Sequence, residues 1–148
     1  MEIRPLRLDD LDPLLALFAQ LNPRDAPLPP RADTESIWRD LLRMPGCKVF
    51  GGFADSALIA TCTLVVIPNL TRGGRSWGVI ENVVTHEAWR RQGHGRRLLA
   101  HALEHAWALG CYKVMLQTGR RDDATIRFYA GAGFDPHEKQ SFVARPPR

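Results

Sequence analysis

Four arginines and two glycines fall within eight consecutive residues of this 148-residue chain. Residues 90–97 read Arg-Arg-Gln-Gly-His-Gly-Arg-Arg, between a predicted strand and the clearest predicted helix. A helix start is already electropositive because its first N–H groups are free, so added cations destabilise it unless an anion binds. Gly93 and Gly95 lack side chains, which lets the backbone approach phosphate oxygens. The segment therefore predicts a site for a ligand with several phosphates, which the arginines also contact.

Two well-known phosphate loops do not fit this segment. No Gly-Lys-Ser/Thr follows, which excludes a Walker loop. The three glycines of a dinucleotide-binding turn are not present either. The alternative is a solvated loop that happens to be rich in arginine. Position, glycines and charge together favour the anion site.

The residues that commonly bind metals are scattered. Cys47, Cys62 and Cys111 are far apart and odd in number, which favours reduced, buried thiols. His101 and His105 lie one helical turn apart, but the sequence places no third ligand with them. We therefore expect no metal site.

Hydrophobic periodicity and turn residues divide the chain into alternating strands and helices. The clearest helix, residues 94–109, ends at Gly110. Its apolar stripe contains Leu98, Leu99, Ala102, Leu103, Ala106 and Trp107. A helix over residues 33–44 is expected to bury Ile37, Trp38, Leu41 and Leu42. The other predicted elements are a first strand near residues 3–8, a helix at 9–21, a hairpin of 48–54 with 57–67, strands at 76–85, 112–118 and 142–144, and a helix at 122–132.

This order of elements predicts an α/β fold with a mixed sheet and helices on its faces, in one domain over residues 1–148. Hydrophobic residues make up 45% and charged residues 24% of the chain, as in ordinary globular proteins. The longest apolar stretch, residues 57–67, is too short to cross a bilayer. The N-terminal residues have no apolar core of a signal peptide, so we expect a cytoplasmic protein.

The net charge of +4 suits an anionic partner. A nucleic-acid-binding protein would spread basic residues and aromatics over a continuous face. Here the charge is concentrated in one loop and balanced elsewhere by sixteen acidic residues. We expect neither nucleic acid nor a membrane as a partner.

Two motifs resemble a known family. Arg90-x-x-Gly93-x-Gly95 after a strand is similar to the Arg/Gln-x-x-Gly-x-Gly/Ala motif of the GNAT superfamily of N-acetyltransferases. Residues 126–134, Ile-Arg-Phe-Tyr-Ala-Gly-Ala-Gly-Phe, resemble the late helix of that family, where an aromatic-Tyr pair is followed by Gly-Phe. Locally, residues 80–84, 109–113 and 126–133 look closest to glucosamine-6-phosphate acetyltransferases, whereas residues 119–123 depart from them.

The resemblance implies a GNAT-like fold, with a central twisted mixed sheet flanked by about four helices. It also implies an acyltransferase that uses acetyl-CoA as co-substrate. At the position of Asp122 the family often has an Asn that contacts the coenzyme. An ionised Asp can accept a hydrogen bond there but cannot donate one. The coenzyme-binding residues implied are Val83, Val84, Thr85, Arg90, Arg91, Gln92, Gly93, His94, Gly95, Arg96 and Asp122.

Two residues are implied as catalytic. Tyr129 matches the tyrosine that protonates or hydrogen-bonds the departing thiolate, and a phenol with a pKa of about 10 is protonated at neutral pH and can donate to a thiolate with a pKa of about 8.5. The alternative is a tyrosine that only packs with Ile126 and Phe128. Glu81 matches a glutamate of the aminosugar branch that removes a proton from the amine directly or through water. A structural carboxylate is the alternative for Glu81, and His86 is a weaker candidate base.

The activity we expect is direct transfer of an acetyl group from acetyl-CoA to a primary amine of a small molecule, with an amino sugar as one candidate. Two alternatives are acetylation of a protein N-terminus or lysine, and a non-catalytic protein that senses coenzyme A. A homodimer is also compatible with the sequence.

Overall fold

The computed structural model describes residues 1–147 and contains five strands and four α-helices. No helix among these residues is long and apolar enough to span a membrane. In chain order the elements are β1 (Glu2–Pro5), α1 (Leu11–Leu21), α2 (Arg31–Arg43), β2 (Cys47–Ala54), β3 (Ala57–Ile67), β4 (Trp77–Thr85), α3 (His94–Ala108), β5 (Val114–Leu116) and α4 (Asp123–Ala130).

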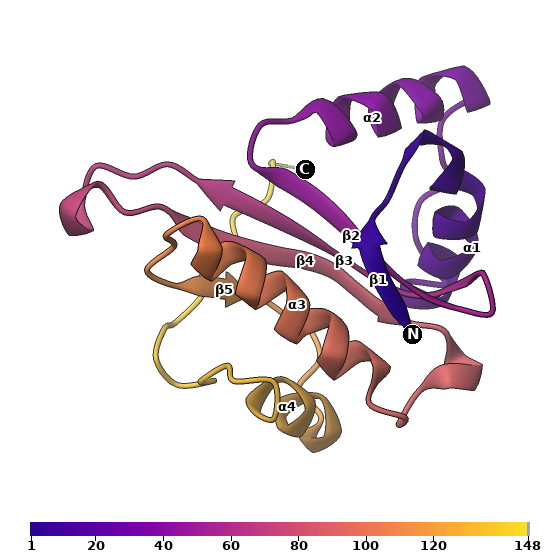
Figure 1. Cartoon of the computed structure of the whole chain (residues 1–148). Helices are drawn as coiled ribbons and strands as arrows, with labels where there is room; N and C mark the ends of the chain where they lie inside the picture. The colour runs from indigo at the N-terminus through magenta and orange to yellow at the C-terminus, as the bar shows by residue number, and fades with distance from the viewer. Residues whose placement is uncertain (148) are drawn as a thin grey trace.

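The strands form one sheet in the order β1-β2-β3-β4-β5. Strands β1 to β4 pair antiparallel with one another, whereas β5 pairs in parallel with β4, so the predicted mixed sheet is confirmed. Helices α1 and α2 pack on one face of the sheet, and α3 crosses the other, with α4 on the same side as α3 (Figure 1). The β2–β3 hairpin turns at Asp55 and Ser56, whose φ angles are 47° and 64°. This turn lies where the sequence predicts it.

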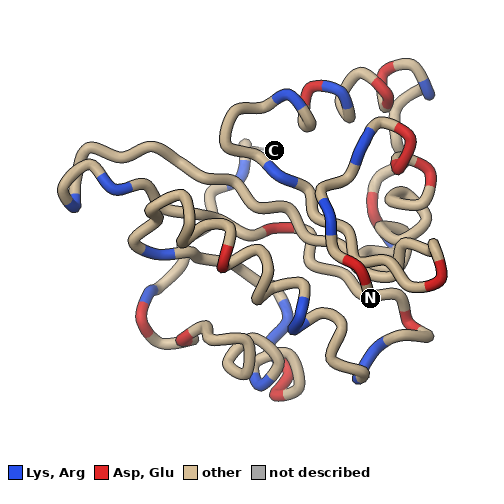
Figure 2. The backbone as a smooth tube through the Cα atoms, in the orientation of Figure 1, with Lys and Arg blue, Asp and Glu red and all other residues tan. Residues whose placement is uncertain are grey.

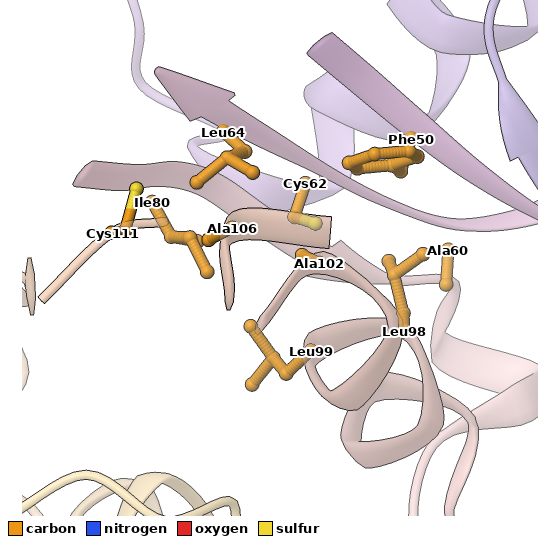
Figure 3. Close-up of a cluster of buried hydrophobic side chains, with 10 residues drawn as sticks. All are labelled: Phe50, Ala60, Cys62, Leu64, Ile80, Leu98, Leu99, Ala102, Ala106 and Cys111. Atoms are coloured by element: carbon orange, nitrogen blue, oxygen red, sulfur yellow. The ribbon is translucent and has the colours of Figure 1, made fainter. Parts of the chain in front are cut away.

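Two hydrophobic clusters hold the layers together, one on each face of the sheet. Beneath α3, Leu98, Leu99 and Ala102 are fully buried against β2, β3 and β4 (Figure 3). On the opposite face, Leu14 and Leu17 of α1 pack with Trp38 of α2. The buried side chains of α3 pack on the strands and so fix the position of its N-terminus relative to β4.

The strands β4 and β5 separate partway along their length. They pair only where Gly78 to Ile80 lie beside Val114 to Leu116, although β4 continues to Thr85. A bulge interrupts the pairing of β3 with β4 between Thr61 and Thr63, and Asn82 in β4 has a φ of 53°. The bulge turns the last residues of β4 relative to the rest of the strand. The result is an open edge of β4 that leads directly toward the start of α3.

Three predictions about elements are wrong. Residues 142–144 form no strand; Phe142 and Val143 are 85% and 69% exposed, so they have neither a strand partner nor a packing surface. Ile37 lies on the solvent side of α2, because the buried positions of that helix are Thr34 and Trp38. Trp107 is 48% exposed, because the buried stripe of α3 includes the predicted Ala106 but does not extend to the next residue.

Candidate active site

A cavity of about 940 Å³ opens between the end of β4, the start of α3 and helix α4. Eleven of the residues predicted for the site line it: Val83, Val84, Thr85, Arg90, Arg91, Gly93, His94, Gly95, Arg96, Asp122 and Tyr129. Two others, Glu81 and Gln92, do not. The fold therefore brings together residues from three segments of the chain that the sequence motifs treat separately.

The loop before α3 turns through two left-handed residues. Arg91 has a φ of 61° and Gly93 a φ of 83°, and α3 begins at the next residue, His94. The first N–H groups of the helix lack intrahelical partners and carry the positive end of the helix dipole. They lie at the cavity, where an anion can accept hydrogen bonds from them.

The two glycines of the motif serve different needs. A Cβ at Gly93 would meet no atom within 4 Å, so the left-handed backbone is what requires glycine there. At Gly95 a Cβ would lie 3.0 Å from Thr85 Oγ1 and 3.1 Å from Phe128 Cζ. Gly95 thus allows β4, α3 and α4 to approach one another closely, a role the sequence motif alone does not show.

The four arginines divide into two pairs. Arg90 Nε donates a hydrogen bond of 3.0 Å to the Thr85 carbonyl, and Arg97 donates one of 3.2 Å to the Met1 carbonyl. Arg91 and Arg96 line the cavity, and within residues 1–147 neither donates a side-chain hydrogen bond to a backbone carbonyl. Among residues 1–147 none of the four forms an ion pair with a carboxylate. Their positive charge is therefore available to a bound anion.

Val83, Val84 and Thr85 form the wall of the cavity where β4 has lost β5 as a partner. On their other side, Val84 and Thr85 remain paired with Thr61 and Ala60 of β3. The open side of this strand leaves backbone N–H and C=O groups to an extended ligand, which can bind as an added strand.

Tyr129 lies half-buried in α4, packed edge-to-face against Phe128 with ring centroids 4.9 Å apart. Burial raises the pKa of Tyr129 above its usual value, and the negative charge of Glu81 adds to this rise. A phenol with a raised pKa stays protonated at neutral pH. The group is therefore available as a hydrogen-bond donor in the cavity.

Glu81 lies outside the cavity lining, just before the bulge at Asn82, and its side chain is exposed. Its partner in the ladder is Thr63 of β3. The Thr63 hydroxyl is buried and has no hydrogen-bond partner among the described residues. Glu81 is nevertheless near enough for its charge to act on Tyr129.

Asp122 caps the start of α4. Its carboxylate accepts a hydrogen bond of 3.0 Å from the Thr125 backbone N–H and another of 3.0 Å from Arg120 Nε. The backbone hydrogen bond from Thr125, together with the contacts to Arg120 and the Thr125 hydroxyl, lowers the pKa of Asp122 to about 2. The carboxylate is thus ionised, and both of its oxygens already accept hydrogen bonds from groups of the protein. Gln92 is similarly occupied, since its amide donates to the Ala88 carbonyl at 3.1 Å.

The cavity also contains residues that the sequence does not single out. Gln20 and Leu21 come from the end of α1, and Thr118 follows β5. Nothing in their local sequence distinguishes them. The packing of α1 beside β4 brings Gln20 and Leu21 to the site, and the path of the chain after β5 brings Thr118. Arg120 and Phe128 also line the cavity. Phe128 lies within the late-helix motif, where an aromatic residue is a recognisable signal, whereas Arg120 lies just before that helix.

Comparison with known proteins agrees with this geometry. Residues 12–134 match the acetyltransferase (GNAT) family. The chain belongs to this family. The glucosamine 6-phosphate N-acetyltransferase of Trypanosoma brucei brucei is 33% identical over 142 residues, covering 95% of this chain and 92% of that protein. An aminoglycoside N(6')-acetyltransferase of Serratia marcescens is 31% identical over 140 residues, covering 93% of each chain.

A solved structure of an Agrobacterium tumefaciens protein described as an acetyltransferase is similar throughout. It has a TM-score of 0.93 and 40% identity, and the match covers 99% of this chain and all of that one. This GNAT protein is therefore an N-acetyltransferase enzyme with the fold of its family. The residues of its cavity fit the family's co-substrate, acetyl-CoA: a cationic loop without carboxylate partners at a helix start, continuous with an unpaired strand edge.

Proposed function

We propose that this acetyltransferase transfers the acetyl group of acetyl-CoA to the primary amine of a small molecule, with amino sugars as the first candidates. One observation carries the proposal. A single cavity joins three features: the arginines near the start of α3, which form no ion pair with a carboxylate within residues 1–147, the open edge of β4, and the hydroxyl of Tyr129. Anion binding, alignment of an extended thioester arm and proton donation are the three requirements of this reaction.

Residues in different parts of the cavity are assigned different steps of acetyl transfer. The N–H groups at the start of α3, with Arg91 and Arg96, bind the pyrophosphate of the coenzyme. The backbone of Val83 and Val84 aligns the pantetheine arm. Acetyl-CoA supplies an activated acyl thioester when bound. The amine nitrogen bonds to the acyl carbon as the carbon–sulfur bond breaks, and the amine gives up one proton. The Tyr129 hydroxyl donates a hydrogen bond to the sulfur as negative charge builds there, and any proton that it passes to the departing thiolate is replaced from solvent, which receives the proton of the amine.

Direct transfer is supported by the state of the three thiols. Cys47, Cys62 and Cys111 are all buried. Burial raises the pKa of each thiol, that of Cys62 to about 12, so these side chains stay protonated at neutral pH. Because the thiolate is the nucleophilic form of cysteine, an acetylated cysteine is disfavoured on the pathway.

Glu81 is the proposed base, acting through water. It is exposed and lies outside the cavity lining, which argues against direct contact with the coenzyme. It precedes the bulge beside the open edge of β4, where an amine can approach from solvent. A water held between Glu81 and the amine can carry the proton to bulk solvent.

The test is a panel of amines assayed for release of coenzyme A. We expect turnover with amino sugars such as glucosamine 6-phosphate or with aminoglycosides, the substrates in the names of the relatives described above. Peptides with a free N-terminus or a lysine form the second arm. Turnover of peptides alone would replace the small-molecule proposal. Coenzyme binding by calorimetry without turnover of any amine would favour a non-catalytic sensor.

Three further expectations belong to this proposal. The chain functions as one N-acetyltransferase domain over residues 1–148, it works in the cytoplasm, and it can form a homodimer. Size-exclusion chromatography with light scattering measures the assembly directly.

A further inference from the structure

We propose that a second pocket, at the other end of β4, binds the phosphate group of a small anionic ligand. The pocket has a volume of about 450 Å³. It forms where the β3–β4 connection, the start of the β5 segment and the chain after α4 meet. Its lining residues are Arg72, Arg75, Tyr112, Lys113, Glu138 and Lys139.

Four of these six residues are cations, and only one is an acid. Within residues 1–147, none of the four cations forms an ion pair with a carboxylate, Glu138 included. Four cations confined to one pocket repel one another unless an anion compensates them. The pocket thus has the electrostatic character of the arginine loop before α3, but it is built from segments far apart in sequence.

Backbone and aromatic contacts hold three of the four cations, Arg72, Arg75 and Lys113. Arg75 donates a hydrogen bond of 3.3 Å to the Cys111 carbonyl. The Lys113 ammonium lies 5.2 Å from the centre of the Trp77 ring, and the Arg72 guanidinium 5.9 Å from that of Tyr112. Such contacts position a cation and leave its N–H groups free for a ligand. The pocket is therefore partly organised before an anion binds.

The second pocket is separate from the coenzyme cavity. The two share no lining residue. They lie toward opposite ends of β4, since Thr85 at the end of the strand lines the coenzyme cavity and Arg75, just before its start at Trp77, lines the second pocket. Figure 2 shows Lys and Arg on the β3–β4 connection at one end of the strand and on the loop before α3 at the other. A coenzyme bound in the large cavity leaves the second pocket open to another ligand.

The chemistry of the pocket fits a phosphorylated small molecule. Guanidinium and ammonium groups together favour a phosphate, which offers several acceptor oxygens to them. The volume lies within the usual range for small-molecule sites. The cations surround one pocket and do not extend as a stripe, which argues against nucleic acid. The phosphate has two sources: a group on the acceptor amine itself, or a separate phosphorylated molecule.

The binding test uses inorganic phosphate and pyrophosphate as probes, with the protein saturated by coenzyme A so that the large cavity is filled. Amide chemical shifts of residues 72–76 and 111–113 are followed by NMR. We expect saturable shifts in the wild type and at least about tenfold weaker binding in Arg72→Gln/Lys113→Gln, which removes two charge-assisted contacts. The control Arg24→Gln/Arg43→Gln removes the same charge from exposed positions away from both pockets and should bind like the wild type.

Absence of saturable shifts, or equal binding by the two double variants, would overturn the proposal. Because the readout is binding, it does not depend on turnover of any amine. Kinetics then separate the two sources. A rise in KM of the pocket variant for glucosamine 6-phosphate, with no rise for glucosamine, assigns the phosphate to the acceptor. Weaker phosphate binding with an unchanged ratio of the two KM values assigns the pocket to a separate molecule.

Discussion

Tyr129 and Asp122 both line the coenzyme cavity, but their surroundings shift their ionisation in opposite directions. Burial raises the pKa of Tyr129, whereas hydrogen bonds from Thr125 and Arg120 lower the pKa of Asp122 to about 2. At neutral pH the cavity therefore contains a neutral proton donor and a fixed negative charge. Each state leads to a separate test.

Changing Tyr129 to Phe should lower kcat and leave coenzyme affinity nearly unchanged. The variant keeps the ring that packs on Phe128 and removes only the donor, which is needed as charge builds on sulfur. Loss of one donor to a developing charge commonly costs about a hundredfold to a thousandfold in rate. Steady-state kinetics with an amine from the panel, together with calorimetry of coenzyme A, measure both quantities. A folded variant that turns over at the wild-type rate would assign Tyr129 to packing alone.

Changing Asp122 to Asn should strengthen coenzyme binding, by roughly threefold to tenfold, because it removes a negative charge from beside a polyanion. The Asn oxygen can still cap α4 by accepting from the Thr125 N–H. Asp123→Asn is the matched control, since Asp123 is the next residue, is exposed and does not line the cavity. Calorimetry compares the two. Equal effects of both variants would mean that only the overall charge of α4 matters.

At the scale of elements, the close approach of α3 to β4 and α4 depends on Gly95. A Cβ added at Gly95 would lie 3.0 Å from Thr85 Oγ1 and 3.1 Å from Phe128 Cζ. Contacts this short require the neighbours to move. Because Thr85 and Phe128 both line the cavity, any movement also changes the coenzyme site.

Gly95→Ala should therefore destabilise the fold by about 1–3 kcal/mol, as overpacking commonly does, and weaken coenzyme binding as well. Gly110, at the other end of α3, has a φ of 76°, and a Cβ there would meet no atom within 4 Å. Gly110→Ala should cost about 1–2 kcal/mol through its left-handed backbone and leave coenzyme affinity unchanged. Urea unfolding and calorimetry on the two variants give both numbers. Wild-type stability and affinity in Gly95→Ala would contradict the tight packing.

Across the whole molecule, the charge is distributed unevenly. Lys and Arg lie on many elements, but clusters of them occupy the connection before β4 and the loop after it (Figure 2). The fold itself depends mainly on the two apolar clusters on either face of the sheet. Burial of apolar surface involves no charges, so screening by salt affects it little. Ligand binding and folding should therefore respond differently to salt.

Salt should weaken coenzyme binding more than it weakens the fold. The coenzyme raises Tm according to its affinity, so the gain in Tm at a fixed coenzyme concentration should shrink between roughly 0.05 M and 0.5 M NaCl as charges are screened. The Tm of the free protein should change less. Thermal melts with and without coenzyme at both salt concentrations provide the measurement. An equal gain at the two concentrations would show that the arginines contribute little to binding.

Much of the fold and part of the site followed from local sequence. The hairpin turn at Asp55 and Ser56, the helix after Gly93 and its end at Gly110 all lie where the sequence predicts them. These features depend on backbone dihedral preferences and on hydrophobic periodicity, which a few neighbouring residues determine. The arginine–glycine segment and the late helix likewise predicted the family, because each motif is continuous in the chain.

Tertiary structure decided what depends on contacts between distant segments. Residues 142–144 have the composition of a strand, but a strand also needs a partner edge and a packing surface, and neither is present there. Trp107 is apolar yet exposed, because the rotation of α3 against the sheet buries Ala106 and leaves the next residue toward solvent. The second pocket gathers Arg72, Lys113 and Lys139 from three separate segments. No local pattern encodes such proximity, since it arises from the sheet order and from the path of the chain between its elements.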